Sequence, residues 1–570
     1  MVAWGRSQLF VRLGRLSAIN SLLVTLVLAL VLARDLTTWQ LVPIYFATPL
    51  AFLVAGAIVA LPISGTIQRA GPQPRFPTSL LLTGVALLGL ALRLFRIDSP
   101  SVWYDEIFTL SVSRLPFAPM NAALIRDIVH PPLHYYVLHG WFQAFGFGPF
   151  QARLLSACYG TLAVLAIYVL ASYLFDRRTT VLSALLLAVS QLAIMYSQEA
   201  RPYAQFLLIF LGCVYLFLRA LREKSLPLWI VFLCLSSLLI YTHYYGFLVL
   251  LSVILFGIVY RKRYSLPAKW LLGGTFGLAL AYLPWFTSGV IGQALHGTKA
   301  QTLGAWAHSG PERVHWFTFI TSLNTFNNGR PNGLLALAPW WTFIVGGLLF
   351  SLPAAFALRP FVVRQSDRTD EGNERENLVF LVLLLAVPMA LALAAGFVRR
   401  TYDVKYVAFC AAPYYILVAR GISTMRSAAV RWAFIAFLLA YSVRSLRANY
   451  FIPYKEDYKG ALASMAHDYR PGDCAVVAQP WEERQARWAW SIYEGDQPDL
   501  RVVPLDSTLS PAAQCQRVWL ISVLYRETPP AVEAAESARR RLAPSYATIE
   551  RRRFFWVDID LYGAVRAAPR

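Results

Sequence analysis

The chain has 570 residues, of which 57% are hydrophobic and 15% charged, and its mean hydropathy is +0.50. This composition excludes an ordinary soluble globular protein and indicates a polytopic membrane protein. The formal charge of +21 would suggest a nucleic-acid partner in a soluble protein. Here the Lys and Arg residues stand in short loops between apolar runs, which indicates membrane topology instead and predicts no nucleic-acid binding.

Apolar runs long enough to cross a bilayer recur along the first 450 residues. A helical span needs about 20 residues, and the sequence predicts about 13 of them. They are expected at 17–33, 41–61, 78–95, 151–174, 180–196, 204–220, 227–241, 244–260, 270–287, 335–358, 378–397, 404–419 and 432–446. The first run follows three arginines and is interpreted as an uncleaved span, with a cleavable signal peptide as the alternative.

The basic residues predict the orientation. They fall in every second connection, which places the N-terminus and these connections in the cytoplasm. The segment Leu133–Gly148 is short, aromatic and broken by glycine, so it is interpreted as an interfacial helix and not as a further span. The loop 96–150, the loop 288–334 and the C-terminal region are then all expected on the outer face of the cytoplasmic membrane.

From about Asn449 the composition changes, because charges become frequent and short apolar runs appear. Strands are expected at 474–478, 501–505, 517–525 and 554–562, and helices around 459–467 and 531–541. The expected fold is therefore an α-helical membrane protein with a small C-terminal α/β domain. Its predicted parts are two extra N-terminal spans (1–77), a catalytic membrane domain (78–448) and an extracytoplasmic domain (449–570). Cys474 and Cys515 each precede a strand, and whether they pair is left open.

Asp105 and Glu106 form a rare acidic pair in the loop that follows the 78–95 run. They are flanked by Trp103, Tyr104 and Phe108. A carboxylate at a membrane surface can accept the proton of a hydroxyl acceptor, so Asp105 is the expected general base and Glu106 its orienting partner. The alternative is a solvated loop or an ion pair with a nearby arginine.

Further candidates stand at the outer ends of expected spans. The sequence SQEARPYA carries Glu199, Arg201 and Tyr203, where the cation is suited to a phosphate and Glu199 to a metal or a sugar hydroxyl. A plain helix cap is the alternative. His130, His134 and His243 are expected to form hydrogen bonds or contact phosphate; a divalent metal is the weaker alternative, because no ligand spacing supports it.

An outer-face loop, Phe397–Tyr406, contains Arg399, Arg400 and Lys405. Cations are disfavoured on this side of the membrane, so binding of a lipid-linked phosphate is the expected explanation. Pairing with lipid headgroups or with Asp403 is the alternative.

Taken in order, these motifs resemble the GT-C polytopic glycosyltransferases, in particular protein O-mannosyltransferases and aminoarabinose transferases. The resemblance covers residues 78 to 450. It is carried by Asp105-Glu106, His130-Pro-Pro-Leu, Arg153-Leu-Leu-Ser, Glu199-Ala-Arg201 and Lys405-Tyr406. It implies a polyprenyl-phosphate sugar donor, an acidic base in the first loop and basic residues that hold the phosphate, with Arg153 and Tyr406 in the substrate site. Many relatives carry Lys in place of His130 and Arg in place of Lys405.

The resemblance leaves the sugar, the cofactor requirement and the acceptor open; a glycan, a lipid and a protein are all candidates for the acceptor. A transporter or flippase is the main rival, but the spans keep their ionisable residues at their ends and not near the middle of the membrane. A polysaccharide polymerase or ligase with a pyrophosphate-linked donor is a second rival, and an assembly scaffold a third.

Overall fold

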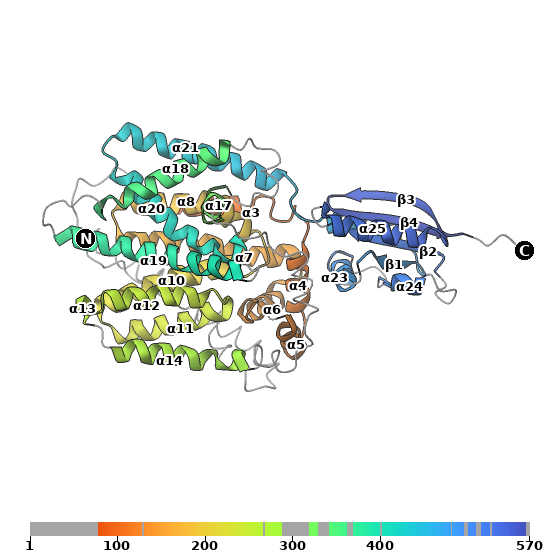
Figure 1. Ribbon diagram of the computed structural model, residues 1–570, viewed down its shortest axis with the longest axis horizontal. Coiled ribbons are helices and arrows are strands. Elements are labelled where there is room, and N and C mark those ends of the chain that lie inside the picture. The colour runs from red at the N-terminus through yellow and green to blue at the C-terminus, as the bar shows by residue number, and fades with distance from the viewer. Residues whose placement is uncertain are drawn as a thin grey trace, which may run out of the picture.

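The computed structural model describes residues 78–127, 130–265, 268–287, 318–328, 341–361, 369–398, 402–479, 482–494, 500–508, 515–524 and 527–565. The spans expected at 17–33 and 41–61, and most of the loop 288–334, lie outside these residues. The described chain forms a helical bundle followed by a smaller part built around a β-sheet (Figure 1).

Most helices of the bundle lie side by side along the long axis of the molecule (Figure 1). The helices of this part are α3 (Thr78–Leu94), α4 (Tyr104–Ser113), α5 (Phe117–Asp127), α6 (Leu133–Phe145), α7 (Pro149–Leu174), α8 (Arg177–Val189), α9 (Gln191–Ser197), α10 (Tyr203–Glu223), α11 (Leu226–Thr242), α12 (Gly246–Val259), α13 (Arg261–Tyr264), α14 (Ala268–Trp285), α17 (Thr318–Asn328), α18 (Trp341–Ala357), η3 (Arg359–Phe361), α19 (Thr369–Val398), η4 (Val404–Cys410), α20 (Ala411–Thr424) and α21 (Ala428–Phe451).

The spans expected from residue 78 onward fall on helices of the described chain, but 180–196 is divided between α8 and α9, 404–419 is divided between η4 and α20, and residues 335–340 lie outside the described residues. By length and composition, five stretches of the described chain can cross a membrane: α7, α10, α19, the continuous η4–α20 and α21. A sixth is added if α8 and α9, which meet at a bend of 55°, form one span. Helices α3, α11, α12 and α18 are apolar but shorter than the roughly 20 residues that a full crossing requires. The total of about 13 spans therefore stays a prediction.

The bend between α8 and α9 lies against a buried arginine of α3. The carbonyl groups of Leu187 and Ala188, at the C-terminal end of α8, accept hydrogen bonds from the buried guanidinium of Arg93 on α3 (3.3 and 3.2 Å). Arg93 also donates to Ser197 Oγ at 3.1 Å. Gly160 on α7 permits this approach, because a Cβ atom there would lie 2.0 Å from that same oxygen. The end of α9, and with it the turn that follows, is thereby fixed against α3 and α7.

The C-terminal part contains a four-stranded sheet in the order β1-β2-β4-β3, parallel between β1 and β2 and antiparallel elsewhere. One face packs on α22 and α23 and the other on α25, each through buried apolar side chains. The elements are α22 (Tyr458–Asp468), β1 (Cys474–Val477), α23 (Glu483–Tyr493), α24 (Leu505–Thr508), β2 (Arg517–Val523), α25 (Pro529–Leu542), β3 (Tyr546–Phe554) and β4 (Val557–Ala564).

The predictions of strands at 501–505 and 554–562 were wrong. Residues 501–505 form only a single bridge, between Val502 and Ala475, where Pro504 lacks the N–H that would continue the ladder. The run 554–562 is not one strand but contains the hairpin turn between β3 and β4, in which Trp556 has a positive φ of 58°. Helix α23 and strand β3 were not anticipated. Cys474 and Cys515 form a disulfide that ties the start of β1 to the residues before β2.

The sheet-containing part and the loop after α3 share one core. Val102 and Ile107 are fully buried in the same apolar cluster as residues of α22, α23 and the sheet. The hydroxyl of Tyr493, at the end of α23, accepts a hydrogen bond from the backbone N–H of Val102 at 2.7 Å. Helix α4 is therefore held between the bundle and the C-terminal part.

Candidate active site

Asp105 and Glu106 occupy the first turn of α4, not a loop as expected from the sequence. Acidic groups favour this position because the N-terminus of a helix carries partial positive charge. Successive residues of a helix project about 100° apart, so the two neighbouring carboxylates enter different surroundings. Glu106 is fully buried, whereas the Asp105 side chain keeps 14% of its surface exposed.

Glu106 is surrounded by donors. Its carboxylate receives two hydrogen bonds from the Arg153 guanidinium (2.9 and 3.0 Å), one from the N–H of Ala200 (3.0 Å) and one from Lys455 Nζ (2.9 Å). Burial opposes the charged form, but Arg153 and Lys455 outweigh it and lower the pKa of this carboxyl to about 2. Glu106 is therefore a permanently ionised group at the centre of a packed network.

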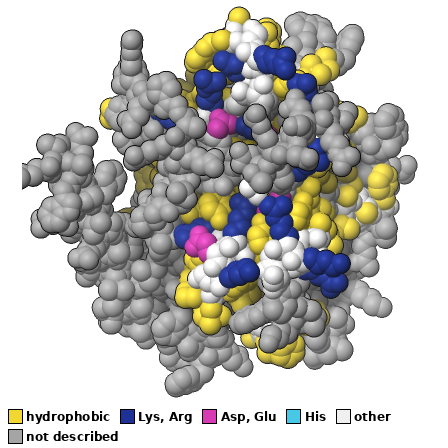
Figure 2. All heavy atoms as spheres, turned by 90° about the vertical axis from the view of Figure 1, so that its left-hand side faces the viewer, with side chains coloured by type: hydrophobic (Ala, Val, Ile, Leu, Met, Phe, Trp, Pro, Cys, Tyr) yellow, Lys and Arg dark blue, Asp and Glu magenta, His cyan; other side chains and the backbone are white. Residues whose placement is uncertain are grey.

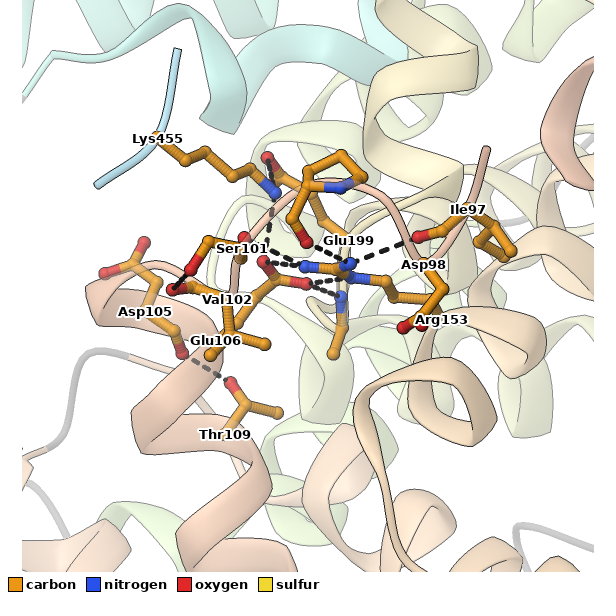
Figure 3. A network of polar contacts seen from close by, with 12 residues as sticks. Ile97, Asp98, Ser101, Val102, Asp105, Glu106, Thr109, Arg153, Glu199 and Lys455 are labelled. Carbon is orange, nitrogen blue, oxygen red and sulfur yellow. Dashed lines mark hydrogen bonds and ion pairs between the residues drawn. The ribbon is translucent and has the colours of Figure 1, made fainter. Parts of the chain in front are cut away.

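Lys455 links this network to Glu199. Its ammonium lies 3.1 Å from Glu199 Oε1, and its side chain is almost completely buried. We call Glu106, Arg153, Glu199 and Lys455 the ionic quartet; two formal positive charges balance two negative ones. Figure 3 shows Lys455 reaching from the segment between α21 and α22 toward Glu106 and Glu199. Sequence reasoning missed Lys455, because it stands beyond the last expected span in a charged stretch, YKEDYK, with nothing to single it out.

Arg153 was expected to contact phosphate. Its remaining N–H groups donate to backbone carbonyl oxygens of the protein. Beyond Glu106 it donates to the carbonyl oxygens of Ile97, Pro100 and Ser101 at 3.1, 2.8 and 3.1 Å. The guanidinium thus fixes the segment that leads from α3 into α4.

Asp105 faces two other cations. Its Oδ2 atom lies 3.2 Å from Lys405 Nζ and 3.7 Å from Arg201 Nη2. Arg201 is oriented by further bonds to Asp105 O and Thr109 Oγ1 (3.1 and 2.8 Å). Lys405 also lies 3.9 Å from Asp403, so the expected alternative partner is present in addition to Asp105. Lys405 and Lys455 both lie within cation–π distance of the Trp103 ring, at 5.3 and 6.0 Å.

Beside Arg201 and Lys405 lies a buried group of rings that we call the histidine–tyrosine cluster: His130, His243, Tyr203 and Tyr406. Ring centroids of His130 and His243 are 5.0 Å apart, and those of His243 and Tyr406 are 5.5 Å apart. Both ring nitrogens of His130, His243 Nε2 and the Tyr203 hydroxyl have no hydrogen-bond partner among the described residues. Buried polar atoms are normally satisfied, so this cluster has the character of a binding surface.

The histidines are held neutral. Burial, assisted by the positive charge of Arg201, lowers the pKa of His130 well below its usual value and that of His243 to about 3. The pKa of His134, whose Nδ1 lies 2.9 Å from Gln205 Oε1, is lowered to about 4, chiefly by burial. Neutral imidazoles offer hydrogen bonds without charge. Among the described residues, no group of three His, Cys, Asp or Glu side chains is placed to hold a metal ion.

The expected site residues therefore converge on α4 from distant parts of the chain. Asp105, Glu106, His130, Arg153, Glu199, Arg201, Tyr203, His243, Lys405 and Tyr406 all belong to the quartet, to the histidine–tyrosine cluster or to the Asp105 ion pairs. Arg399 and Arg400 lie outside the described residues.

No curated protein sequence matches the chain. Among solved structures, the archaeal oligosaccharyltransferase AglB from Archaeoglobus fulgidus, in complex with an inhibitory peptide and a dolichol-phosphate, aligns at 14% identity and a TM-score of 0.48, covering 86% of this chain and 74% of that chain. ArnT from Cupriavidus metallidurans, bound to undecaprenyl phosphate, aligns at 14% identity and a TM-score of 0.42, covering 86% and 99%.

A family model adds to these similarities. Residues 129–285, which include His130, Arg153, Glu199, Arg201, Tyr203 and His243, match the model of the dolichyl-phosphate-mannose-protein mannosyltransferase family. For this part of the chain, the match confirms the resemblance to GT-C polytopic glycosyltransferases that the sequence indicated.

Proposed function

We propose that the protein is an integral-membrane glycosyltransferase that moves a sugar from a polyprenyl-phosphate donor to a hydroxyl acceptor. The observation that carries the proposal is the Asp105 carboxylate, paired with Lys405 and Arg201 beside buried polar atoms that have no partner among the described residues. A base, two phosphate-binding cations and an uncharged surface for sugar hydroxyls are the groups that this transfer requires.

In the proposed reaction, the phosphate of the donor binds Lys405 and Arg201, which then share their positive charge between it and Asp105. The acceptor oxygen attacks the anomeric carbon, and its proton passes to Asp105. The bond between that carbon and the phosphate oxygen breaks, and polyprenyl phosphate leaves without needing a proton, because the two cations stabilise its charge. Arg399 and Arg400, close to Lys405 in sequence, remain expected contributors to phosphate binding.

Two observations support a site on the outer face of the cytoplasmic membrane. Lys and Arg side chains gather at the end of the bundle opposite the sheet (Figure 2), where Arg178, Arg261, Lys262, Arg263 and Arg426 are exposed. Basic residues favour the cytoplasmic side, which directs α4 and the sheet outward. The Cys474–Cys515 disulfide suits an oxidising compartment.

The test is transfer of labelled sugar from a panel of polyprenyl-phosphate donors, with membranes containing the wild type, Asp105→Asn or Asp98→Asn. The first substitution removes the base with almost no change in size, and we expect a loss of roughly hundredfold or more. The control, Asp98, belongs to the same segment but is a half-exposed partner of Lys459, so Asp98→Asn should transfer normally.

Equal transfer by the wild type and Asp105→Asn would remove Asp105 as the base. Absence of transfer by the wild type with every donor would contradict the proposed donor class. Transport of the donor lipid without transfer would favour the transporter instead.

A further inference from the structure

Lys455 is the one member of the ionic quartet that comes from beyond the bundle helices. It stands between α21 and α22, and its ammonium meets Glu106 Oε2 at 2.9 Å and Glu199 Oε1 at 3.1 Å. The titratable groups that face it are Glu106, Glu199, Arg153 and the buried Tyr454. Glu106 has Arg153 as a second cation, whereas the only cation paired with Glu199 among the described residues is Lys455.

Glu199 has a free position. Its Oε2 atom is buried and has no hydrogen-bond partner among the described residues. A buried carboxylate oxygen in this state is costly unless a donor reaches it. A substrate hydroxyl is a donor of the right kind, since an ionised carboxylate only accepts hydrogen bonds.

Three consecutive residues of the turn that carries Glu199 each contact either a carboxylate of α4 or Lys455. Glu199 meets Lys455, the N–H of Ala200 donates to Glu106 at 3.0 Å, and Arg201 contacts Asp105. A change at Lys455 therefore acts on a turn that also supports the proposed base.

We propose that Lys455 is a positioning residue that orients Glu199, so that the second carboxylate oxygen of Glu199 binds a hydroxyl group of the donor sugar or of the acceptor. This inference rests on the proposed function for its ligand. It makes the C-terminal part, through the segment that begins it, a contributor to the substrate site and not merely an appended domain.

The first test uses stability and needs no activity. Lys455→Met leaves the buried Glu199 carboxylate without a cation, which should lower Tm. Adding Glu199→Gln removes the unpaired carboxylate and should restore part of that Tm, whereas Glu199→Gln in the wild type, where Lys455 keeps Glu106 as a partner, should not raise Tm. An equal effect of Glu199→Gln in the wild type and in Lys455→Met would overturn the assigned coupling to Glu199.

The second test uses the donor that the wild type transfers. We expect Lys455→Met to lose roughly 10- to 100-fold in kcat/KM. Lys455→Arg should recover much of the activity. A raised KM for the donor would assign the bound hydroxyl to the sugar, and a lowered kcat at unchanged KM would assign it to the acceptor.

The matched control is Lys459→Met, four residues further on, where a half-exposed lysine pairs with Asp98 at 3.5 Å. It should behave as the wild type. Lys455→Met with the kinetics of this control would contradict the inference. Absence of transfer by the wild type would instead reject the proposed function, while the Tm comparison would still decide whether Lys455 acts on Glu199.

Discussion

Two polar regions meet at α4, and they differ in how their groups are satisfied. In the ionic quartet, Glu106 and Arg153 are saturated with hydrogen bonds and fully buried. In the histidine–tyrosine cluster, whose residues come from other segments of the chain, buried nitrogens and a hydroxyl have no partner among the described residues. The first arrangement fixes a geometry, and the second leaves bonding capacity for a ligand. Asp105 stands at the boundary, paired but partly accessible.

The largest loss of stability is expected from substitution of Arg153, in the ionic quartet. Arg153→Met removes the bidentate partner of Glu106 and leaves three charges of the quartet, with Lys455 alone to balance two carboxylates. Loss of one partner from a buried ion pair typically costs about 3–5 kcal/mol. We expect a strongly lowered Tm and poor yield in detergent, both partly restored by the added substitution Glu106→Gln. Exposed Arg178→Met is the control, and a wild-type Tm in Arg153→Met would contradict the structural role of the quartet.

Acidification acts differently on Glu106 and on His134, a buried histidine of α6 outside the histidine–tyrosine cluster. Arg153 and Lys455 outweigh burial and lower the pKa of Glu106 to about 2, so this carboxylate stays ionised at pH 5. The pKa of His134 is lowered to about 4, and an unfolded histidine titrates near 6.5. Between these values the unfolded chain binds a proton that the native state does not, so stability should fall as the pH decreases from about 6.5 toward 4.

At pH 5 this amounts to about 2 kcal/mol for one such buried histidine. The check is Tm at pH 7 and pH 5 for the wild type, His134→Gln and, as control, the exposed His467→Gln. The acid-induced drop in Tm should shrink in His134→Gln only. A drop of the same size in all three proteins would show that other groups control the acid response.

The smallest effect is expected from substitution of Tyr203, in the histidine–tyrosine cluster. The Tyr203 hydroxyl is buried and without a hydrogen-bond partner among the described residues, so Tyr203→Phe should leave Tm unchanged or slightly raised. If that hydroxyl binds substrate, transfer should fall about 2- to 10-fold, the equivalent of one neutral hydrogen bond. Lowered Tm with unchanged transfer would show that the hydroxyl has a structural partner instead.

The positions of the apolar helices could be predicted because their signal is local. A run of about 20 apolar residues has few alternatives to a spanning helix, and the described residues of the spans expected from 78 onward lie mostly in helices, although 180–196 is divided by the bend between α8 and α9. The sheet region was harder, because its edge strand β3 (YATIERRRF) is mostly exposed, contains a run of four charged residues, and shows no alternation of apolar residues. Helix α23 was missed for a similar reason: its buried face is short and lies among arginines and glutamates.

The sequence revealed site residues where a charged side chain stands in an apolar stretch. It did not reveal them where the neighbouring residues are also charged. Asp105, Arg201 and Lys405 stand out against apolar surroundings, and the structure brings them together. Their mutual pairing, and the different surroundings of Asp105 and Glu106, depend on helix phase and on contacts far apart in sequence. Lys455 illustrates the limit, since a lysine in a charged stretch becomes significant only when two carboxylates from other segments meet it.

The shared core between α4 and the C-terminal part also orders the events of synthesis. Glu106 can meet Arg153 as soon as α7 has formed, since only 47 residues separate them. Lys455 stands 349 residues after Glu106 and is synthesised much later. Until then, Val102 and Ile107 have no sheet or α23 to cover them. These residues therefore stay uncovered while the helices between α7 and α21 are synthesised, and α4 acquires its final cover only when the C-terminal part folds onto it.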